Sequence, residues 1–313
     1  MDPDAAAADI GRTRNWESMV RIDQGWSSDT KYRVVSSDGQ ELMLRIADAD
    51  QLERKEFEYQ CLERVAALGI VMPTPIEFGV SGAGTCVYTL LAWVTGTDAE
   101  CALPSFTSAE KHELGAKAGA ALAAIHSLDG EIEAPSWEAH YAAKIERVIK
   151  WYDSGPARLP HDDKVVRFVR ESAGLLGNRP IRLQHGDFHL GSLVVTPERG
   201  IGVIDFNRCS CGDPWEEYDR YVFTWSRSPE FASGQIDGYF DGHPPDSFFP
   251  LLKLYNGVHM LASMPWAASF GDDQVQIMRE NALAVYASYD GFESTVPTWY
   301  RSGDNESATR SPT

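Results

Sequence analysis

One short stretch, residues 183–206, constrains most strongly what this 313-residue chain can fold into. It contains two apolar, β-branched runs, Leu193–Val195 and Ile201–Ile204, joined by the connection T-P-E-R-G. This pattern predicts a β-hairpin. Asp187 precedes the first strand and Asp205 follows the second, so the hairpin is expected to bring both carboxylates to the same end. Such a pair suits a base beside a Mg²⁺ ligand, because Mg²⁺ is held by one or two carboxylates together with phosphate oxygens.

The residues around these aspartates read H-G-D-F-H-L-G-S and then V-I-D-F. They resemble the catalytic and metal segments of the aminoglycoside phosphotransferase family. The resemblance implies that Asp187 is the catalytic base, that Asp205 binds Mg²⁺, and that His185 fixes the loop. The family has Asn five residues after the base, where this chain has Ser192. Since hydroxyl groups bind Mg²⁺ in other phosphotransferases, Ser192 is predicted to be a second metal ligand.

The resemblance covers most of residues 20–290 and implies the fold class α+β, in the form of a bilobal protein-kinase-like fold. A small N-terminal β-sheet lobe is expected over residues 1–94. A larger, mainly helical C-terminal lobe is expected over residues 95–292. Residues 1–15 are predicted to be a loose polar arm. Residues 293–313 are rich in polar residues with Gly, Ser and Pro, which predicts a disordered tail.

The nucleotide is expected to bind to the first lobe. In kinase-like folds a small-residue turn covers the phosphates through backbone N–H groups, and a strand supplies a cation for them. The last strand of that lobe contacts the purine base of the nucleotide. By resemblance, Gly25, Ser27 and Ser28 form the turn. The phosphate-binding cation is Arg45 in M-L-R-I. The segment that meets the nucleotide base contains Leu91 and Trp93 in V-Y-T-L-L-A-W-V.

A helix is predicted over residues 53–68, because apolar residues recur there at helical spacing. Glu58 falls within that apolar stripe, and a carboxylate that faces a core needs a partner. Arg45 is the natural candidate, and the pair would reproduce the strand-to-helix ion pair of kinases. A purely structural ion pair is the alternative interpretation.

The second half of the chain reads as helical. Thr107 and Glu110 form a capping box that predicts the start of a helix. Asp219 matches an aspartate of the family pattern that is expected to brace the Asp187 loop. Glu216 and Glu217 are candidate acidic contacts for the substrate, with exposed helix carboxylates as the alternative. Further helices are predicted over residues 136–152, 162–176, 220–226, 231–240, 247–268 and 272–289.

Composition restricts the partners. The formal net charge of −18, from 46 acidic and 28 basic residues, argues against nucleic acid and anionic membranes and favours a cationic substrate. No apolar run reaches the roughly 18 residues that a membrane span needs. The acidic start M-D-P-D-A lacks the basic residues of a signal peptide, and the five cysteines have no scaffold spacing. We therefore expect a cytoplasmic protein, and the sequence gives no indication of its oligomeric state.

These features predict a small-molecule O-phosphotransferase that uses Mg²⁺ and either ATP or GTP. The expected acceptor is the hydroxyl group of an aminoglycoside-type antibiotic, so that the enzyme would give resistance by modification. A macrolide, nucleoside or peptide antibiotic, or a small metabolite, is the alternative acceptor. Stacking on an uncharged antibiotic would use the aromatic helices around Trp137, Trp151, Trp225 and Trp266.

Three other classes of function were weighed. A catalytically weak nucleotide-binding pseudokinase would explain Ser192, but both aspartates are retained. A metallohydrolase could use His185, Asp187 and His189, but it needs a further group of ligands, and none is obvious in the sequence. A protein kinase would be expected to carry A-P-E after Asp205, and this chain does not.

Overall fold

The structure is a computed structural model that describes residues 2–12, 14–23, 28–81 and 84–301. The N-terminal part is built on a five-stranded sheet with the order β1-β2-β3-β5-β4, in which every neighbouring pair is antiparallel. Ser36 and Gln40 close the turn between β2 and β3, in which Gly39 has φ 82°. The strands are β1 (Trp16–Ile22), β2 (Thr30–Ser36), β3 (Glu41–Asp48), β4 (Pro75–Ser81) and β5 (Cys86–Ala92).

Helix α1 (Pro3–Arg12) covers one face of this sheet. The prediction of a loose arm over residues 1–15 is therefore wrong for this segment. The small and apolar residues Ala6, Ala7 and Ile10 lie on one side of the helix and are buried. They share a core cluster with alternate residues of β3, namely Leu42, Leu44 and Ile46.

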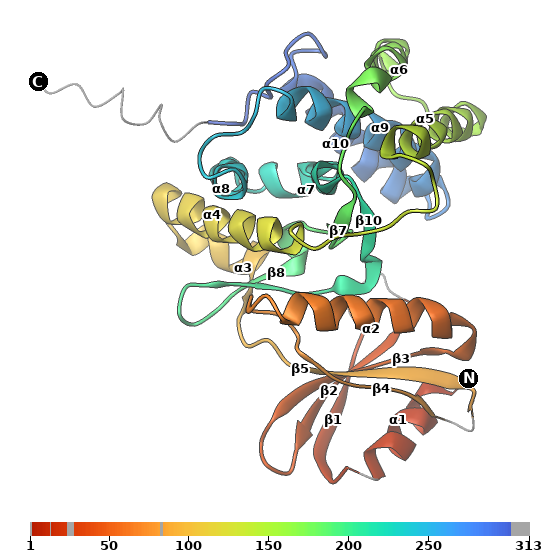
Figure 1. Cartoon of the computed structure of the whole chain (residues 1–313), viewed down its shortest axis with the longest axis vertical. Coiled ribbons are helices and arrows are strands. Elements are labelled where there is room, and N and C mark those ends of the chain that lie inside the picture. Colours follow the sequence, from red (N-terminus) through yellow and green to blue (C-terminus); the bar gives the residue numbers. More distant parts are fainter. Residues whose placement is uncertain (1, 13, 24–27, 82–83, 302–313) are drawn as a thin grey trace, which may run out of the picture.

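Helix α2 (Leu52–Ala66) covers the opposite face and lies between the sheet and the rest of the molecule (Figure 1). Its Cys61, Leu62 and Val65 are buried, as the helical spacing predicted. Successive side chains of a strand point to opposite faces. Arg45 therefore points away from α1 and towards α2, because its neighbours Leu44 and Ile46 face α1.

The C-terminal part is mainly helical, as predicted (Figure 1). The capping box of Thr107 and Glu110 is present at the start of α4. Helices α4 and α8 touch through glycines, since a Cβ on Gly119 would lie 2.0 Å from the carbonyl oxygen of Gln235. The α-helices are α3 (Ala99–Ala102), α4 (Ser108–Ile125), α5 (Trp137–Ser154), α6 (Asp162–Glu171), α7 (Val222–Trp225), α8 (Pro229–Tyr239), α9 (Phe248–Ala268) and α10 (Asp272–Ser288).

Short strands, among them β7, β8 and β10, lie between the sheet and these helices, and short 3₁₀ helices occur in both parts of the molecule (Figure 1). The strands are β6 (Thr97–Asp98), β7 (Arg182–Gln184), β8 (Leu193–Val195), β9 (Ile201–Val203) and β10 (Ser210–Gly212), and the 3₁₀ helices are η1 (Ala49–Gln51), η3 (Leu103–Ser105), η4 (Ser172–Leu176), η5 (Leu190–Ser192), η6 (Phe206–Arg208) and η7 (Pro214–Tyr218). The predicted hairpin is confirmed, because β8 pairs antiparallel with β9. The chain leaves the large sheet after Ala92 and pairs with β8 from Thr97, so the predicted lobe boundary after residue 94 falls between these points.

The first residues of the predicted tail pack against the molecule, so the prediction of disorder is wrong for them. Trp299 is only 7% exposed and stacks on Trp225, with ring centroids 5.9 Å apart. The hydroxyl of Tyr300 donates to Asp237 at 2.8 Å. Aromatic side chains therefore outweigh the polar composition over residues 293–301, and residues 302–313 lie outside the described part. Among the described helices, none combines the length and apolar character that crossing a lipid bilayer requires.

Candidate active site

The loop of residues 185–191, here called the Asp187 loop, follows β7 and is tied to the far end of the hairpin. His185 is fully buried, and its Nε2 donates to the carbonyl oxygen of Ile204 at 2.8 Å. Its Nδ1 accepts from the backbone N–H of Asp187 at 3.2 Å. The backbone N–H of Ile204 donates in turn to the carbonyl oxygen of Ser192 at 2.9 Å. Because Ile204 directly precedes Asp205, these bonds bring both ends of the loop to the strand end that carries the second aspartate.

Glu217 holds the Asp187 loop from the opposite side. Its carboxylate accepts from the backbone N–H groups of Gly186 at 2.8 Å and of Phe188 at 3.2 Å, and His126 Nε2 lies 3.5 Å away. Burial raises the pKa of this carboxyl. The neighbouring His126 and the backbone N–H of Gly186 are among the groups that outweigh this effect, so the net pKa lies below its usual value. The interpretation of Glu217 as an exposed helix carboxylate is wrong, because its carboxylate is buried and binds the loop, whereas its contact with a substrate stays a prediction.

Two arginines and a histidine surround the carboxylate of Asp187. Arg220 donates from Nη1 to Oδ1 at 2.8 Å, and His189 Nε2 lies 3.6 Å from the same oxygen. Arg208 Nε lies 3.6 Å from Oδ2. Burial raises the pKa of Asp187, but Arg220, His189 and Arg208 outweigh it and hold the pKa below the usual value. Asp187 is therefore an ionised acceptor at neutral pH.

Asp205 follows β9 in the left-handed backbone region, with φ 67°. Its side chain is about one third exposed, and Oδ1 lies 3.7 Å from Nη1 of Arg45. A partly open carboxylate with no closer cation is a suitable oxygen ligand for Mg²⁺. Ser192 is only 3% exposed, so a metal ion bound to its hydroxyl would carry little water on that side. The residues present thus fit the predicted ion.

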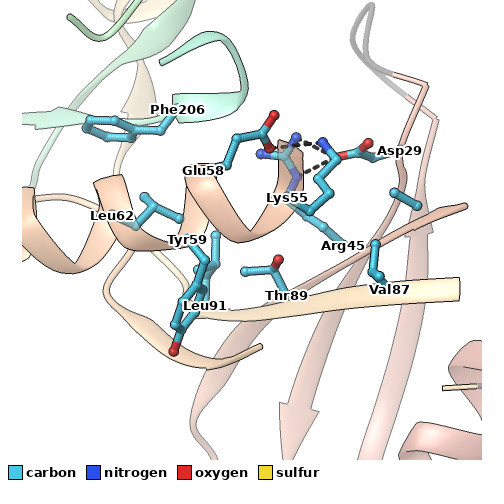
Figure 2. Close-up of a pocket in the computed structure, with 11 residues that line it drawn as sticks. Asp29, Arg45, Lys55, Glu58, Tyr59, Leu62, Val87, Thr89, Leu91 and Phe206 are labelled. Atoms are coloured by element: carbon cyan, nitrogen blue, oxygen red, sulfur yellow. Dashed lines mark hydrogen bonds and ion pairs between the residues drawn. The ribbon is translucent and has the colours of Figure 1, made fainter. Parts of the chain in front are cut away.

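Four side chains form a buried charge network between β3, α2 and the start of β2 (Figure 2). Arg45 donates from Nε and Nη2 to Oδ2 of Asp29, at 3.0 and 2.6 Å. Lys55 donates to the same oxygen at 3.0 Å and to Glu58 at 2.9 Å. The predicted ion pair between Arg45 and Glu58 is therefore wrong. Lys55 lies three residues before Glu58 on the same helix, and it takes the carboxylate that was assigned to Arg45.

The charge network lines one end of a small pocket between α2 and the sheet, which has room for about one water molecule (Figure 2). Leu91 is 3% exposed and lines it together with apolar residues of α2 and β5. The N–H of Trp93 donates to Glu41 at 3.0 Å, so this group is not available to a nucleotide base. Ser28 is exposed, whereas Gly25 and Ser27 lie outside the described residues.

A second cavity, of about 520 Å³, opens beside the Asp187 loop. Glu216 lines it, pairs with Lys144 and accepts from Gln184 Nε2 at 3.3 Å. Its side chain is 13% exposed, so the exposed-helix interpretation is wrong. Burial raises the pKa of Glu216 above its usual value although Lys144 opposes the shift, and burial also raises the pKa of Asp219. The cavity wall therefore holds two buried carboxyl groups with raised pKa values, opposed by the cations Lys144 and Arg220.

The aromatic residues proposed for stacking divide into two kinds. Trp137 is 2% exposed and donates from Nε1 to the hydroxyl of Tyr255 at 2.9 Å. Trp225 stacks on Trp299 in the core. These two side chains are used by the fold, whereas Trp151 is 45% exposed.

The metallohydrolase interpretation conflicts with the bonds of His185. Both of its ring nitrogens are used by the backbone, so neither is available to a metal ion. In the part of the chain that the structure describes, no group of three or more His, Cys, Asp or Glu side chains is placed to hold a metal. The zinc-type centre that such an enzyme needs is therefore not formed by these residues.

Sequence reasoning missed several charged residues of these sites, among them Asp29, Lys55, Lys144, Arg208 and Arg220. The signal for Lys55 was present, because residues three apart on a helix are neighbours. Arg220 lies outside the motifs, and no signal identified it. Lys144 and Asp29 come from segments whose contacts with the sites depend on tertiary packing.

The matched family model, described as the phosphotransferase enzyme family, covers residues 18–249. Aminoglycoside phosphotransferase APH(4)-Ia in complex with ADP and hygromycin B is 15% identical, with a TM-score of 0.65, covering 90% of this chain and 97% of that one. The GDP complex of aminoglycoside 2'-phosphotransferase IIIa is 13% identical, with a TM-score of 0.70 and coverages of 93% and 98%. A choline/ethanolamine kinase family protein from Mesorhizobium loti is 17% identical, with a TM-score of 0.65 and coverages of 94% and 98%.

No curated protein has a matching sequence. At these low sequence identities, the structural similarity shows the fold alone. It is the predicted protein-kinase-like α+β fold. The family model spans well over half of the chain and includes the hairpin and both aspartates. The chain therefore belongs to the phosphotransferase enzyme family.

Proposed function

We propose that this phosphotransferase moves the γ-phosphoryl group of ATP or GTP to a hydroxyl group of a cationic small molecule, in the first place an aminoglycoside-type antibiotic. One observation carries the proposal. The ionised carboxylate of Asp187 lies next to a cavity whose wall holds Glu216 and Asp219. A base for the hydroxyl group and carboxylates for an ammonium group are thus found together.

The chain's own residues have distinct roles in this reaction. Asp187 accepts the proton of the attacking hydroxyl or orients it, and Arg220 fixes its Oδ1. A low pKa suits this role, because a loose phosphoryl-transfer transition state requires little early deprotonation. His185 and Glu217 hold the loop and do not exchange protons with substrate, since their polar atoms bind the backbone.

The nucleoside triphosphate donor is expected on the side of Asp205 where Arg45 lies. Asp205 and Ser192 would hold Mg²⁺, which supplies charge neutralisation of the phosphates when bound. Arg45 lies 3.7 Å from Asp205 and is placed to bind the α- and β-phosphates. Leu91, near the end of β5, is the residue that the family resemblance assigns to the nucleotide base.

The negative charge of the cavity wall and of the whole protein favours a cationic acceptor. Glu216 and Asp219 have raised pKa values, and an ammonium group beside them would stabilise their ionised forms. The net charge of −18 acts in the same direction at longer range. A small amino alcohol would satisfy the same carboxylates and is the second candidate. A macrolide acceptor is less favoured, because Trp137 and Trp225 are used by the core.

The test is a panel of acceptors incubated with MgATP or MgGTP and scored by mass spectrometry. The panel contains aminoglycosides, macrolides, nucleoside and peptide antibiotics, choline and ethanolamine. We expect an aminoglycoside to gain the mass of one phosphoryl group, and we expect Asp187→Asn to abolish the gain. Exclusive modification of the nucleoside or peptide antibiotics that carry no amino group would refute the cationic acceptor, and exclusive modification of macrolides would refute the aminoglycoside-type acceptor. No modified acceptor with either donor would count against the function itself.

A further inference from the structure

Two cations, rather than one, face the region where the phosphates of the donor are expected. Arg45 is 9% exposed and Lys55 is 7% exposed, and both bind the same oxygen of Asp29 (Figure 2). Building on the function proposed above, we propose that Lys55 is a second phosphate-binding cation, and that the carboxylate of Asp29 occupies the phosphate position on both cations until the donor binds.

The bonds around Asp29 resemble those of a bound phosphate oxygen. Its Oδ2 accepts from Arg45 Nε at 3.0 Å, from Arg45 Nη2 at 2.6 Å and from Lys55 Nζ at 3.0 Å. A guanidinium fork and an ammonium group converging on one anionic oxygen form the arrangement by which Arg and Lys recognise phosphate. Asp29 also directly follows Ser28, the last residue of the turn that is predicted to cover the phosphates.

Lys55 keeps its position without Asp29. Glu58 accepts from Lys55 at 2.9 Å through Oε2, while its Oε1 accepts from Arg54 Nε at 3.0 Å. Glu58 therefore aims the ammonium group in the way that the helix carboxylate of a kinase aims its strand lysine. Arg45 lies beside Asp205, the proposed metal ligand, with 3.7 Å between the nearest atoms, and Lys55 shares the Asp29 oxygen with Arg45.

A purely structural network makes a different prediction. Removing one member of a buried charge cluster destabilises the protein in either case, so stability does not separate the two roles. The two roles are separated by whether donor affinity rises or falls in each variant. If Asp29 competes with the phosphates, its removal strengthens donor binding, whereas removal of Lys55 weakens it. If the network only supports the fold, both changes weaken binding or leave it unchanged.

The experiment uses the full chain and isothermal titration with three probes: a non-hydrolysable MgATP or MgGTP analogue, inorganic tripolyphosphate, and the free nucleoside. For Lys55→Gln we expect triphosphate and tripolyphosphate affinity to fall about tenfold or more, with nucleoside affinity unchanged. For Asp29→Asn we expect both phosphate probes to bind about threefold to tenfold more tightly. Arg64→Gln removes a cation from the exposed side of the same helix and should leave all three affinities unchanged.

Equal affinity for the triphosphate in Lys55→Gln and the wild type would overturn the inference, as would weaker tripolyphosphate binding in Asp29→Asn. If Lys55→Gln does not fold, the sign of the Asp29→Asn change decides alone. Donor binding with the expected opposite signs, but with no acceptor modified, would support the inference while counting against the proposed function. A wild-type protein that binds no triphosphate would overturn both.

Discussion

In the Asp187 loop the bracing side chains bind the backbone, whereas the bonds described above for the charge network join pairs of side chains. His185 and Glu217 bind four backbone groups between them, at Ile204, Asp187, Gly186 and Phe188. Asp29, Arg45, Lys55 and Glu58 bind one another. Backbone groups do not exchange partners without a change of fold, but long charged side chains can. The first region is therefore built as a fixed frame, and the second can exchange an internal carboxylate for a ligand.

The largest effect is expected where the fixed frame carries the reacting group. Asp187→Asn keeps the shape of the side chain but removes its negative charge, so it no longer accepts a proton. We expect kcat to fall by about 10²–10⁴. The affinity for a non-hydrolysable donor should stay within about threefold of the wild type, because the charge network is untouched. Steady-state kinetics and isothermal titration on the same preparation measure the two quantities.

This result would show that turnover, which depends on the Asp187 loop, can be changed without changing donor binding by the charge network. A large loss of donor affinity in Asp187→Asn would contradict the comparison, since it would mean that the Asp187 loop and the charge network bind the donor together. Unchanged turnover would contradict the role of Asp187 as the base.

The next effect concerns the cation that holds Asp187. In the native protein the pKa of Asp187 is lowered, so its contribution to stability is present above the unfolded pKa of about 3.9 and is lost as the pH falls through the lower folded value. Arg220→Gln leaves burial less opposed, so the pKa rises. We expect the acid limb of the kcat/KM profile to move to higher pH, with kcat lower by roughly tenfold to a hundredfold.

Arg208→Gln is the matched variant for this comparison. Arg208 lies 3.6 Å from the carboxylate of Asp187, compared with 2.8 Å for Arg220, and lowers its pKa less. Its profile should therefore move in the same direction by a smaller amount. Equal shifts in the two variants, or a shift to lower pH in either, would be incompatible with the observed geometry.

The same contrast explains what could be predicted from the sequence. The hairpin, helix α2 and the capping box of α4 were predictable, because period, turn residues and caps act over a few neighbouring positions. The role of His185 in fixing the loop followed from a motif whose backbone bonds come with the fold. The partner of Arg45 could not be predicted from the sequence, because a buried guanidinium binds whichever carboxylate tertiary packing brings within reach.

Two segments were misjudged because composition hid their pattern. Residues 3–12 are small and acidic, but Ala6, Ala7 and Ile10 form one buried face, and a stripe of alanines is a weak hydrophobic signal. Residues 293–301 are mostly polar, but Trp299 and Tyr300 supply enough aromatic contact to order them. Burial of a few large side chains can outweigh average polarity.

A smaller effect, on stability, should come from Glu217→Gln. The variant removes the ionised acceptor of the N–H groups of Gly186 and Phe188 and turns an amide NH₂ towards the loop. We expect the free energy of unfolding at neutral pH to fall by about 1–3 kcal/mol. Glu217 has a lowered pKa, so its contribution is present above the unfolded value of about 4.3 and is lost as the pH falls through the folded one. Denaturant unfolding at neutral and acid pH measures both.

Glu216→Gln serves as the stability control. Glu216 accepts from the side chains of Lys144 and Gln184, and burial raises its pKa, so neutralising it should change the free energy of unfolding less than Glu217→Gln does. A stability loss in Glu216→Gln as large as that in Glu217→Gln would mean that backbone acceptance is not what distinguishes the loop.

The smallest effect is expected at Ser192, where the fixed frame meets the proposed metal. Its backbone bonds to His189 and Ile204 do not depend on the side chain, so Ser192→Asn should leave the Asp187 loop in place. Asn offers a longer carbonyl oxygen to Mg²⁺ than the hydroxyl does, so we expect kcat to be kept or raised and half-maximal activity to need less Mg²⁺. A magnesium titration of turnover measures this. A fall of about tenfold or more in metal-saturated kcat would argue that the hydroxyl itself is required. An unchanged magnesium requirement would place Ser192 outside the metal site and leave Asp205 as the proposed protein ligand.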